Sequence, residues 1–208
     1  MGWKIKVTPV FEESFRKRRI EQIVERASKE FELVKKKRLV IRELKRLKKL
    51  GIETDKAIKL VKEQKELNLE VLRREGVIDV HTYGYLIQAI ELERDKLIAE
   101  VLEPYVRWLR TEAYSCSSWD EDKILGILKR TNVLVNILKR RMKFIDYPGE
   151  QIEIAYKLEW GFNANLQFGL WLKIDYLKTL KRVRFELDSI YSWLLSILSA
   201  KSEILLEI

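Results

Sequence analysis

A strict alternation of apolar and polar residues between Ile152 and Tyr176 constrains the fold of this chain more than any other sequence feature. Every second residue is apolar on both sides of the short segment Asn163-Ala164-Asn165. Side chains two residues apart lie on one face of a strand but scatter around a helix. The pattern therefore predicts one long antiparallel β-hairpin, residues 152–176, with a single apolar face.

The same pattern restricts how the two strands pair. A shift by one residue would set apolar positions opposite polar ones, so the loop must hold an odd number of residues. The three residues Asn163-Ala164-Asn165 satisfy this condition, and asparagine tolerates the left-handed backbone that short loops need. The predicted register pairs Phe162 with Leu166, Trp160 with Phe168, Leu158 with Leu170, and Ile154 with Ile174.

Two strands alone are marginally stable in water, so the hairpin needs cover. Residues Trp3 to Val7 also alternate, and we expect them to add a third strand before Pro9. We expect helices to pack on the apolar face, including the helix predicted at 177–202.

Helical spacing of apolar residues describes most of the remaining chain. It runs from Phe11 to Leu50 with room for one break, stops at Gly51, and resumes from Thr54 or Asp55 to Arg74. The short connection at Gly51 predicts an antiparallel helical hairpin, 11–75. Its narrow apolar stripes and many charges would let it project as an arm.

We therefore predict an α+β fold that is mostly α-helical, with a long helical hairpin plus helices packed on a small antiparallel sheet built around the 152–176 β-hairpin. An N-terminal strand, 1–10, would join a helical core, 76–208. Within that core, Pro104 would end or kink one helix. Pro148-Gly149 would end the next one.

Composition excludes several classes of protein. No run of 18 apolar residues occurs, so we expect no transmembrane helix. The first residues lack the apolar core of a secretory signal, and Cys116, the single cysteine, cannot form an intrachain disulfide. We expect a cytoplasmic protein. Abundant Lys and Glu with sparse Gln, Asn, Thr, Met and Cys is the balance described for hyperthermophile proteins.

No combination of residues indicates catalysis. The sequence has no Walker-type loop, no dinucleotide-binding glycine turn and one histidine, His81, which argues against zinc and against histidine-based mechanisms. Glu153, Glu159 and Asp175 share the polar face of the hairpin, but lysines on the same face make solvated ion pairs the better explanation. We expect no catalytic residue, no metal site and no cofactor.

Positive charge is concentrated in the first fifty residues, which hold 17 Lys and Arg against 7 acidic residues, in a chain of net charge +9. A second basic stripe, which includes Asn132, follows one face of the helix predicted to end at Pro148. Lys and Arg neutralise phosphates, and Asn donates hydrogen bonds to them. The candidate nucleic-acid-binding residues are Arg16, Lys17, Arg18, Arg19, Lys35, Lys36, Lys37, Arg38, Lys129, Asn136, Lys139, Arg140 and Lys143. Ordinary solvated helix faces explain the same charges without a ligand.

Two functions fit these observations. The leading hypothesis is a non-catalytic interaction or assembly protein that acts through helical surfaces and self-association, with a homodimer or another protein as its partner. The long paired helices and the apolar hairpin face favour it. The alternative is a sequence-nonspecific nucleic-acid-binding protein that uses basic helices 16–49 and 129–143. Convergence of the two basic stripes on one face would favour the alternative.

Overall fold

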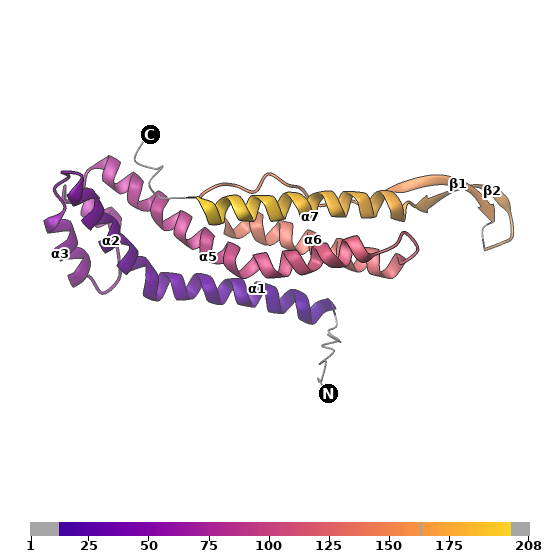
Figure 1. The fold of residues 1–208 in the computed structure, drawn as a ribbon, viewed down its shortest axis with the longest axis horizontal. Coiled ribbons are helices and arrows are strands. Elements are labelled where there is room, and N and C mark those ends of the chain that lie inside the picture. Colours follow the sequence, from indigo (N-terminus) through magenta and orange to yellow (C-terminus); the bar gives the residue numbers. More distant parts are fainter. Residues whose placement is uncertain (1–12, 163, 201–208) are drawn as a thin grey trace, which may run out of the picture.

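The structure is a computed structural model that describes residues 13–162 and 164–200, with side chains from Ile20 onward. The predicted fold class is confirmed: helices form most of the described chain, and one two-stranded antiparallel sheet accompanies them. The predicted strand Trp3 to Val7 lies outside the described residues. Figure 1 shows an elongated molecule with the hairpin at one end.

The first long helix contains one wider turn. Helix α1 (Glu13–Glu30) continues through a π-helical turn, η1 (Phe31–Lys35), into α2 (Lys36–Lys49). Phe31 and Leu39 are eight residues apart, and in an unbroken α-helix this spacing would turn Leu39 about 80° away from the face that holds Phe31. The π turn absorbs one extra residue, and Phe31 and Leu39 are therefore both buried in one hydrophobic cluster.

That cluster forms the head of the molecule, where α2 pairs with α3 (Asp55–Glu63) as the predicted helical hairpin. The sequence pattern suggested one second helix, but α3 ends where Gln64 adopts extended backbone. A separate short helix, α4 (Leu69–Arg74), begins where the Asn68 side chain accepts a hydrogen bond from Val71 N at 3.1 Å. An N-cap of this kind satisfies a free backbone N–H at the start of a helix.

Helix α5 (Val80–Ser115) joins the head to the rest of the molecule. Its 36 residues span about 54 Å at 1.5 Å per residue. Leu86 lies in the head cluster, whereas Leu102 and Leu109 lie in a second cluster. Pro104, which we expected to end or kink the helix, does not end it. Because Pro104 is exposed, water can solvate the carbonyl left free by the missing N–H.

The second cluster fills a bundle made by α1, the later part of α5, α6 (Glu121–Arg141) and α7 (Tyr176–Ser199). Ile20 and Val24 of α1 are buried in it. The region predicted as a projecting arm is thus held along the bundle through α1 (Figure 1).

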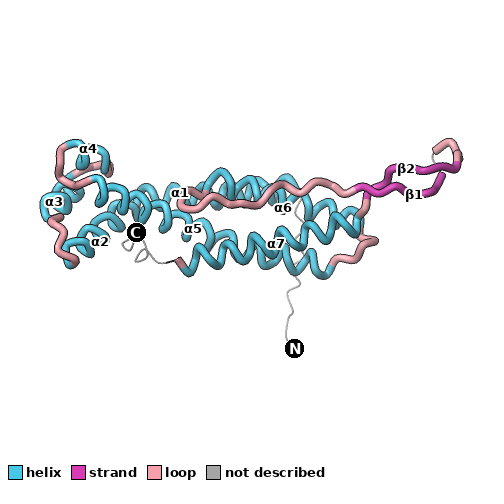
Figure 2. Tube along the Cα trace, turned by 90° about the horizontal axis from the view of Figure 1, so that it is seen from above, coloured by secondary structure: helices cyan, strands magenta, loops and turns pink. Residues whose placement is uncertain are grey.

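A segment without regular secondary structure, 142–155, returns along the bundle and leads into the hairpin (Figure 2). The hairpin consists of β1 (Tyr156–Phe162) and β2 (Phe168–Ile174). The predicted faces are correct, but the predicted register is wrong by two residues. Phe162 pairs with Phe168, so the loop has five residues and not three, and Leu166 has a left-handed backbone with φ 58°.

Two features explain the longer loop. The observed register sets Gly161 opposite Gly169, and these glycines leave space for the Trp171 indole, whose Nε1 donates to Gly161 O at 2.7 Å. The predicted register would also have set two like charges, Glu153 and Asp175, opposite each other, and the observed register does not. Asp175 instead caps α7, where its side chain accepts from Lys178 N.

The expectation that helices cover the apolar face of the hairpin is wrong. The strands extend beyond the end of the bundle, and only the base of the hairpin contacts helices (Figures 1 and 2). The alternating pattern identifies an apolar face, but it carries no information about what covers that face.

Candidate interaction surface

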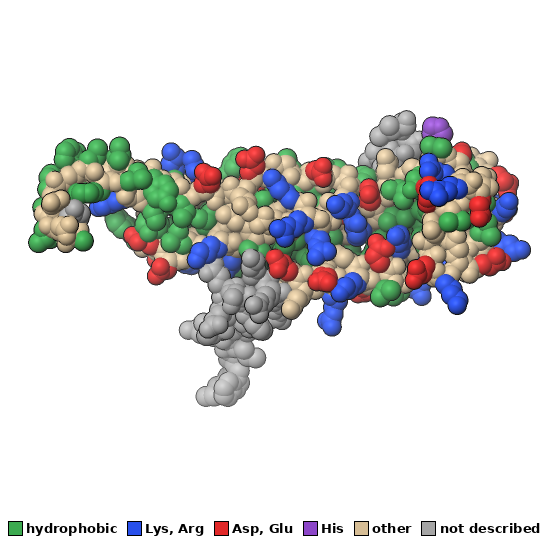
Figure 3. Space-filling view, turned by 180° about the vertical axis from the view of Figure 1, so that it is seen from behind, with side chains coloured by type: hydrophobic (Ala, Val, Ile, Leu, Met, Phe, Trp, Pro, Cys, Tyr) green, Lys and Arg blue, Asp and Glu red, His purple; other side chains and the backbone are tan. Residues whose placement is uncertain are grey.

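The apolar face of the hairpin is open to solvent along its whole length. We define the apolar hairpin face by its eight exposed side chains: Tyr156, Leu158, Trp160, Phe162, Leu166, Phe168, Leu170 and Leu172. Their exposed fractions range from 49% for Leu170 to 81% for Leu166. Figure 3 shows hydrophobic side chains gathered at this end, whereas charges of both signs are interspersed over the bundle. Monomeric soluble proteins rarely expose so large an apolar patch unless it contacts a partner.

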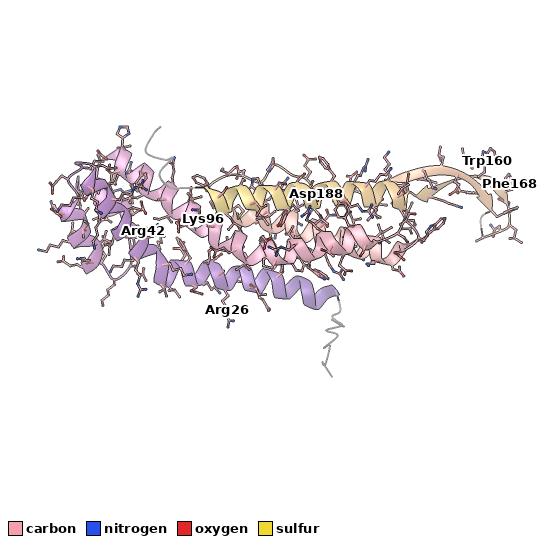
Figure 4. The ribbon with its side chains drawn as sticks, viewed as in Figure 1. Arg26, Arg42, Lys96, Trp160, Phe168 and Asp188 are labelled. Carbon is pink, nitrogen blue, oxygen red and sulfur yellow. The ribbon has the colours of Figure 1, made fainter. Side chains whose placement is uncertain are left out.

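Aromatic contacts order the outer half of the apolar hairpin face. Trp160 stacks on Phe168 with ring centroids 5.5 Å apart, and Phe162 approaches Phe168 at 5.2 Å. Figure 4 shows Trp160 and Phe168 at the outer end of the molecule. Cross-strand pairs of this kind restrict side-chain rotamers. A partner would therefore meet side chains that lose less conformational entropy on binding.

The opposite face of the hairpin is different in character. Glu159 lies 3.7 Å from both Lys157 and Lys173, as the expected solvated ion pairs, and the Trp171 indole lies over the two glycines. Trp171 is half-buried there, so it is not a free contact residue. The hairpin is thus apolar on one side and mostly polar on the other, as in a sheet that packs on one face only.

Contacts at its base fix the hairpin on the bundle. Ala155 N donates to Thr179 Oγ1 of α7 at 3.0 Å, and Asp175 N donates to Ala155 O at 2.7 Å. Asn132 of α6 brackets Ile152, donating to its carbonyl at 2.9 Å and accepting from its N–H at 2.7 Å. These bonds fix the start of β1 and the end of β2 on the bundle, so that the hairpin extends away from it.

Similarity to other proteins gives no guide to the role of this surface. The chain matches no family model, no curated protein and no solved structure. Within the described part of the chain, no helix has the length and apolar character needed to cross a bilayer. Over the same residues, no three His, Cys, Asp or Glu side chains gather where they could hold a metal ion. Function must therefore be inferred from the surfaces themselves.

The first basic cluster predicted for nucleic acid is largely occupied by contacts within the chain. Lys35 and Lys36 pair with Glu30 at 3.3 Å and Glu32 at 2.8 Å. Lys37 Nζ donates to Lys62 O at 2.9 Å and to Gln64 O at 2.6 Å, which satisfies carbonyls at the end of α3.

Arg38, the fourth member of that cluster, lines a groove of 360 Å³ between η1, α2 and α5. Phe31, Leu39 and Leu97 form the apolar part of this groove, and its charges are of both signs. The cluster Arg16, Lys17, Arg18 and Arg19 belongs to α1, and its side chains lie outside the described part of the structure.

The predicted stripe on α6 divides into two parts. Asn132 and Asn136 hold the returning segment, since Asn136 Oδ1 accepts from Gln151 Nε2 at 2.8 Å. Lys129 is exposed but has its own interaction partner within the chain. Lys139 and Arg140, in the last turn of α6, are exposed. Basic residues there also interact favourably with the helix dipole.

Basic residues from both predicted helices, 16–49 and 129–143, do meet in one groove, although Lys29 of the first helix was not itself a candidate. One groove of 550 Å³ is lined by Lys29 and Glu25 of α1, by Glu32 of η1, by Arg94 of α5, by Arg140 and Arg141 of α6, and by Lys143 just after α6. Lys29 pairs with Glu25 at 2.8 Å. That hydrogen bond, with the neighbouring charge of Arg141, holds the pKa of Glu25 below its usual value. The Nε of Arg94 is buried without a hydrogen-bond partner.

Neither remaining candidate for chemistry gains a reactive environment. Cys116 is buried, and burial, with the nearby Asp120 carboxylate, raises the pKa of its thiol. A raised pKa keeps the thiol protonated and poorly nucleophilic. His81 is exposed in the first turn of α5.

Sequence reasoning missed two features of these surfaces. Lys29, Arg94 and Arg141 were not candidates, although Arg141 completes the run Lys139-Arg140-Arg141 at a helix end. The exposure of the hairpin was also missed. One available signal was charge: no residue from 160 to 172 is charged, in a chain whose charged fraction is 35%. Such a segment has little to keep it soluble on its own.

Proposed function

We propose that this chain is a non-catalytic interaction or assembly protein that self-associates by burying its apolar hairpin face. The single observation that carries this proposal is the exposure of eight large apolar side chains on a ribbon that contacts the bundle only at its base. The hairpin, and not the helical surfaces that we expected, supports the proposal best.

Sedimentation velocity over a range of about 1 to 100 µM tests the proposal, because association shifts with concentration by mass action. Leu158 and Leu172 face each other across the strands. The variant Leu158→Lys/Leu172→Glu replaces them with an opposite-charge pair that the hairpin tolerates. We expect wild type to associate and this variant to remain monomeric.

A matched control comes from η1, away from the hairpin. Leu33, in η1, is 84% exposed, so Leu33→Lys removes an exposed leucine without touching the hairpin. It should associate as wild type does. A wild-type chain that stays monomeric at the highest concentration, or equal association by both variants, contradicts the proposal.

We propose nucleic-acid binding without base readout as the second candidate function. The convergence of Lys29, Arg140, Arg141 and Lys143 on one groove supports it. Fluorescence anisotropy with a labelled duplex at two salt concentrations is the test, because phosphate contacts make affinity fall steeply with salt. We expect Arg140→Gln/Arg141→Gln to weaken binding and to reduce its salt dependence. Absence of binding at low salt removes this candidate.

A further inference from the structure

We infer that the partner of the apolar hairpin face is the same face of a second copy, stacked antiparallel so that two hairpins form a four-stranded sandwich between two outward-pointing bundles. This inference rests on the proposed function and names the partner. The resulting contact would be isologous, with the same patch used by both copies, and would close at a dimer.

The one-sided character of the hairpin favours another sheet as its partner. Packed sheets bury their apolar faces against each other about 10 Å apart and keep their outer faces polar. The Lys157, Glu159 and Lys173 cluster would then remain in water on the outside of the sandwich. A lipid layer would suit the face less well. The apolar side chains extend from the tip to Tyr156 at the base, so shallow insertion of the tip would leave half of them in water.

The size of the apolar hairpin face matches what a stable dimer requires. Aromatic side chains bury 150–250 Å² in full and leucines somewhat less, so these four aromatic and four leucine side chains, 49% to 81% exposed, offer roughly 800 Å² per chain. A standard interface takes about 800 Å² from each partner. Pairing of hairpin edges would join only backbone groups and would leave this apolar area in water.

Side-chain sizes favour the antiparallel arrangement. The outer half of the face holds Trp160, Phe162 and Phe168, whereas Leu158 and Leu172 lie nearer the base. Antiparallel stacking about an axis near Trp160 sets Phe162 and Phe168 over the leucines of the second copy, so that the layers interdigitate on either side of the axis. Parallel stacking would instead set the phenylalanine rings of one copy on those of the other. It would also bring two bundles side by side, in a chain of net charge +9.

Spin labels at the hairpin tip test this arrangement. Ala164 is exposed in the loop, and Ala164→Cys gives one reactive thiol because the native Cys116 is buried. In the antiparallel dimer the two labels lie about four residues on either side of a two-fold axis near Trp160. At about 3.3 Å per residue and about 10 Å between sheets, we expect a tip-to-tip distance of about 30 Å by double electron–electron resonance.

The outcomes separate this inference from the proposed function. A dimer with tips about 10–15 Å apart means parallel stacking and overturns the inference alone. Open oligomers that grow with concentration would indicate head-to-tail contacts, and they would also overturn the inference while leaving the proposed function intact. A strict monomer overturns both. Flotation with neutral and anionic vesicles completes the test, since a monomeric chain that floats through its hairpin has a lipid partner.

Discussion

The most enclosed carboxylate of the described chain, Asp95, joins α5 to the end of α6. It is fully buried, and its Oδ2 accepts from Lys143 N at 2.7 Å and Phe144 N at 2.8 Å. Arg94 Nη2 donates to its Oδ1 at 3.2 Å. One side chain thus satisfies backbone donors on a distant segment, and it also fixes the end of α6 that lines the basic groove.

We predict that Asp95→Ala lowers the free energy of unfolding by about 3 kcal/mol, because it leaves two partly buried N–H groups and the mostly buried Arg94 guanidinium without this partner. Asp95→Asn, which keeps one acceptor oxygen, should cost less. Urea denaturation followed by circular dichroism measures both. A loss for Asp95→Ala no larger than that of an ordinary surface substitution contradicts this role.

Two buried tyrosines, Tyr147 and Tyr85, make the folded chain less stable at high pH. Tyr147 OH donates to Glu186 Oε1 at 2.6 Å, and burial, more than this bond, raises the pKa of Tyr147 above its usual value of 10.0. Tyr85, which donates to Glu43, is raised in the same way. Above pH 10 the unfolded chain loses these phenolic protons while the folded chain keeps them. The contribution of these tyrosines to the free energy of unfolding is therefore complete below about pH 10, and it is lost progressively as the pH rises further.

Tyr147→Phe tests that sign. The variant loses the hydrogen bond, so we expect it to be less stable than wild type at about pH 8 by about 1 kcal/mol. Its further loss between about pH 8 and about pH 10.5 should be smaller than that of wild type. Urea denaturation at both pH values is the measurement. Equal losses in the two proteins would show that Tyr147 does not titrate as proposed.

At the scale of elements, the π turn η1 makes a specific prediction. It absorbs one residue more than an α turn, so deletion of the exposed Leu33 should give a continuous α-helix with Phe31 and Leu39 still facing the head. We expect this deletion to change the free energy of unfolding by less than about 1 kcal/mol. Deletion of Lys45 in α2 should cost several times more, since it rotates the buried Leu47 by about 100°.

Thermal and urea unfolding of the two deletion variants gives the comparison. Similar losses in both would mean that η1 is not a one-residue insertion between two helices in register. A head that unfolds separately from the bundle in either variant would appear as a second transition.

The elements also show what the sequence could and could not predict. Parity of the alternating pattern identified both hairpin faces, but a two-residue shift preserves parity, so the pattern could not choose between loops of three and five residues. Leu166 gave no hint of left-handed backbone. Likewise, Lys37 looked like a surface cation because nothing in the sequence shows that Lys62 and Gln64 carbonyls lie within its reach.

At the scale of the whole molecule, two cores and a ribbon are arranged along one axis. The head and the bundle share α5 and bury their own apolar surfaces, whereas the hairpin buries almost none of its own. The α+β class could be predicted because periodicity reports each element separately. The exposure of the hairpin could not, because covering a face depends on where other elements lie in space.

The central claim is that the apolar hairpin face is exposed in a single chain and buried in an assembly. The most direct measurement is the rate at which maleimide labels Leu158→Cys as the chain concentration rises, with Leu33→Cys as the control. We predict that labelling of position 158 slows at least about tenfold across the association range, while labelling of position 33 stays constant. Equal rates for both positions at every concentration would contradict the account.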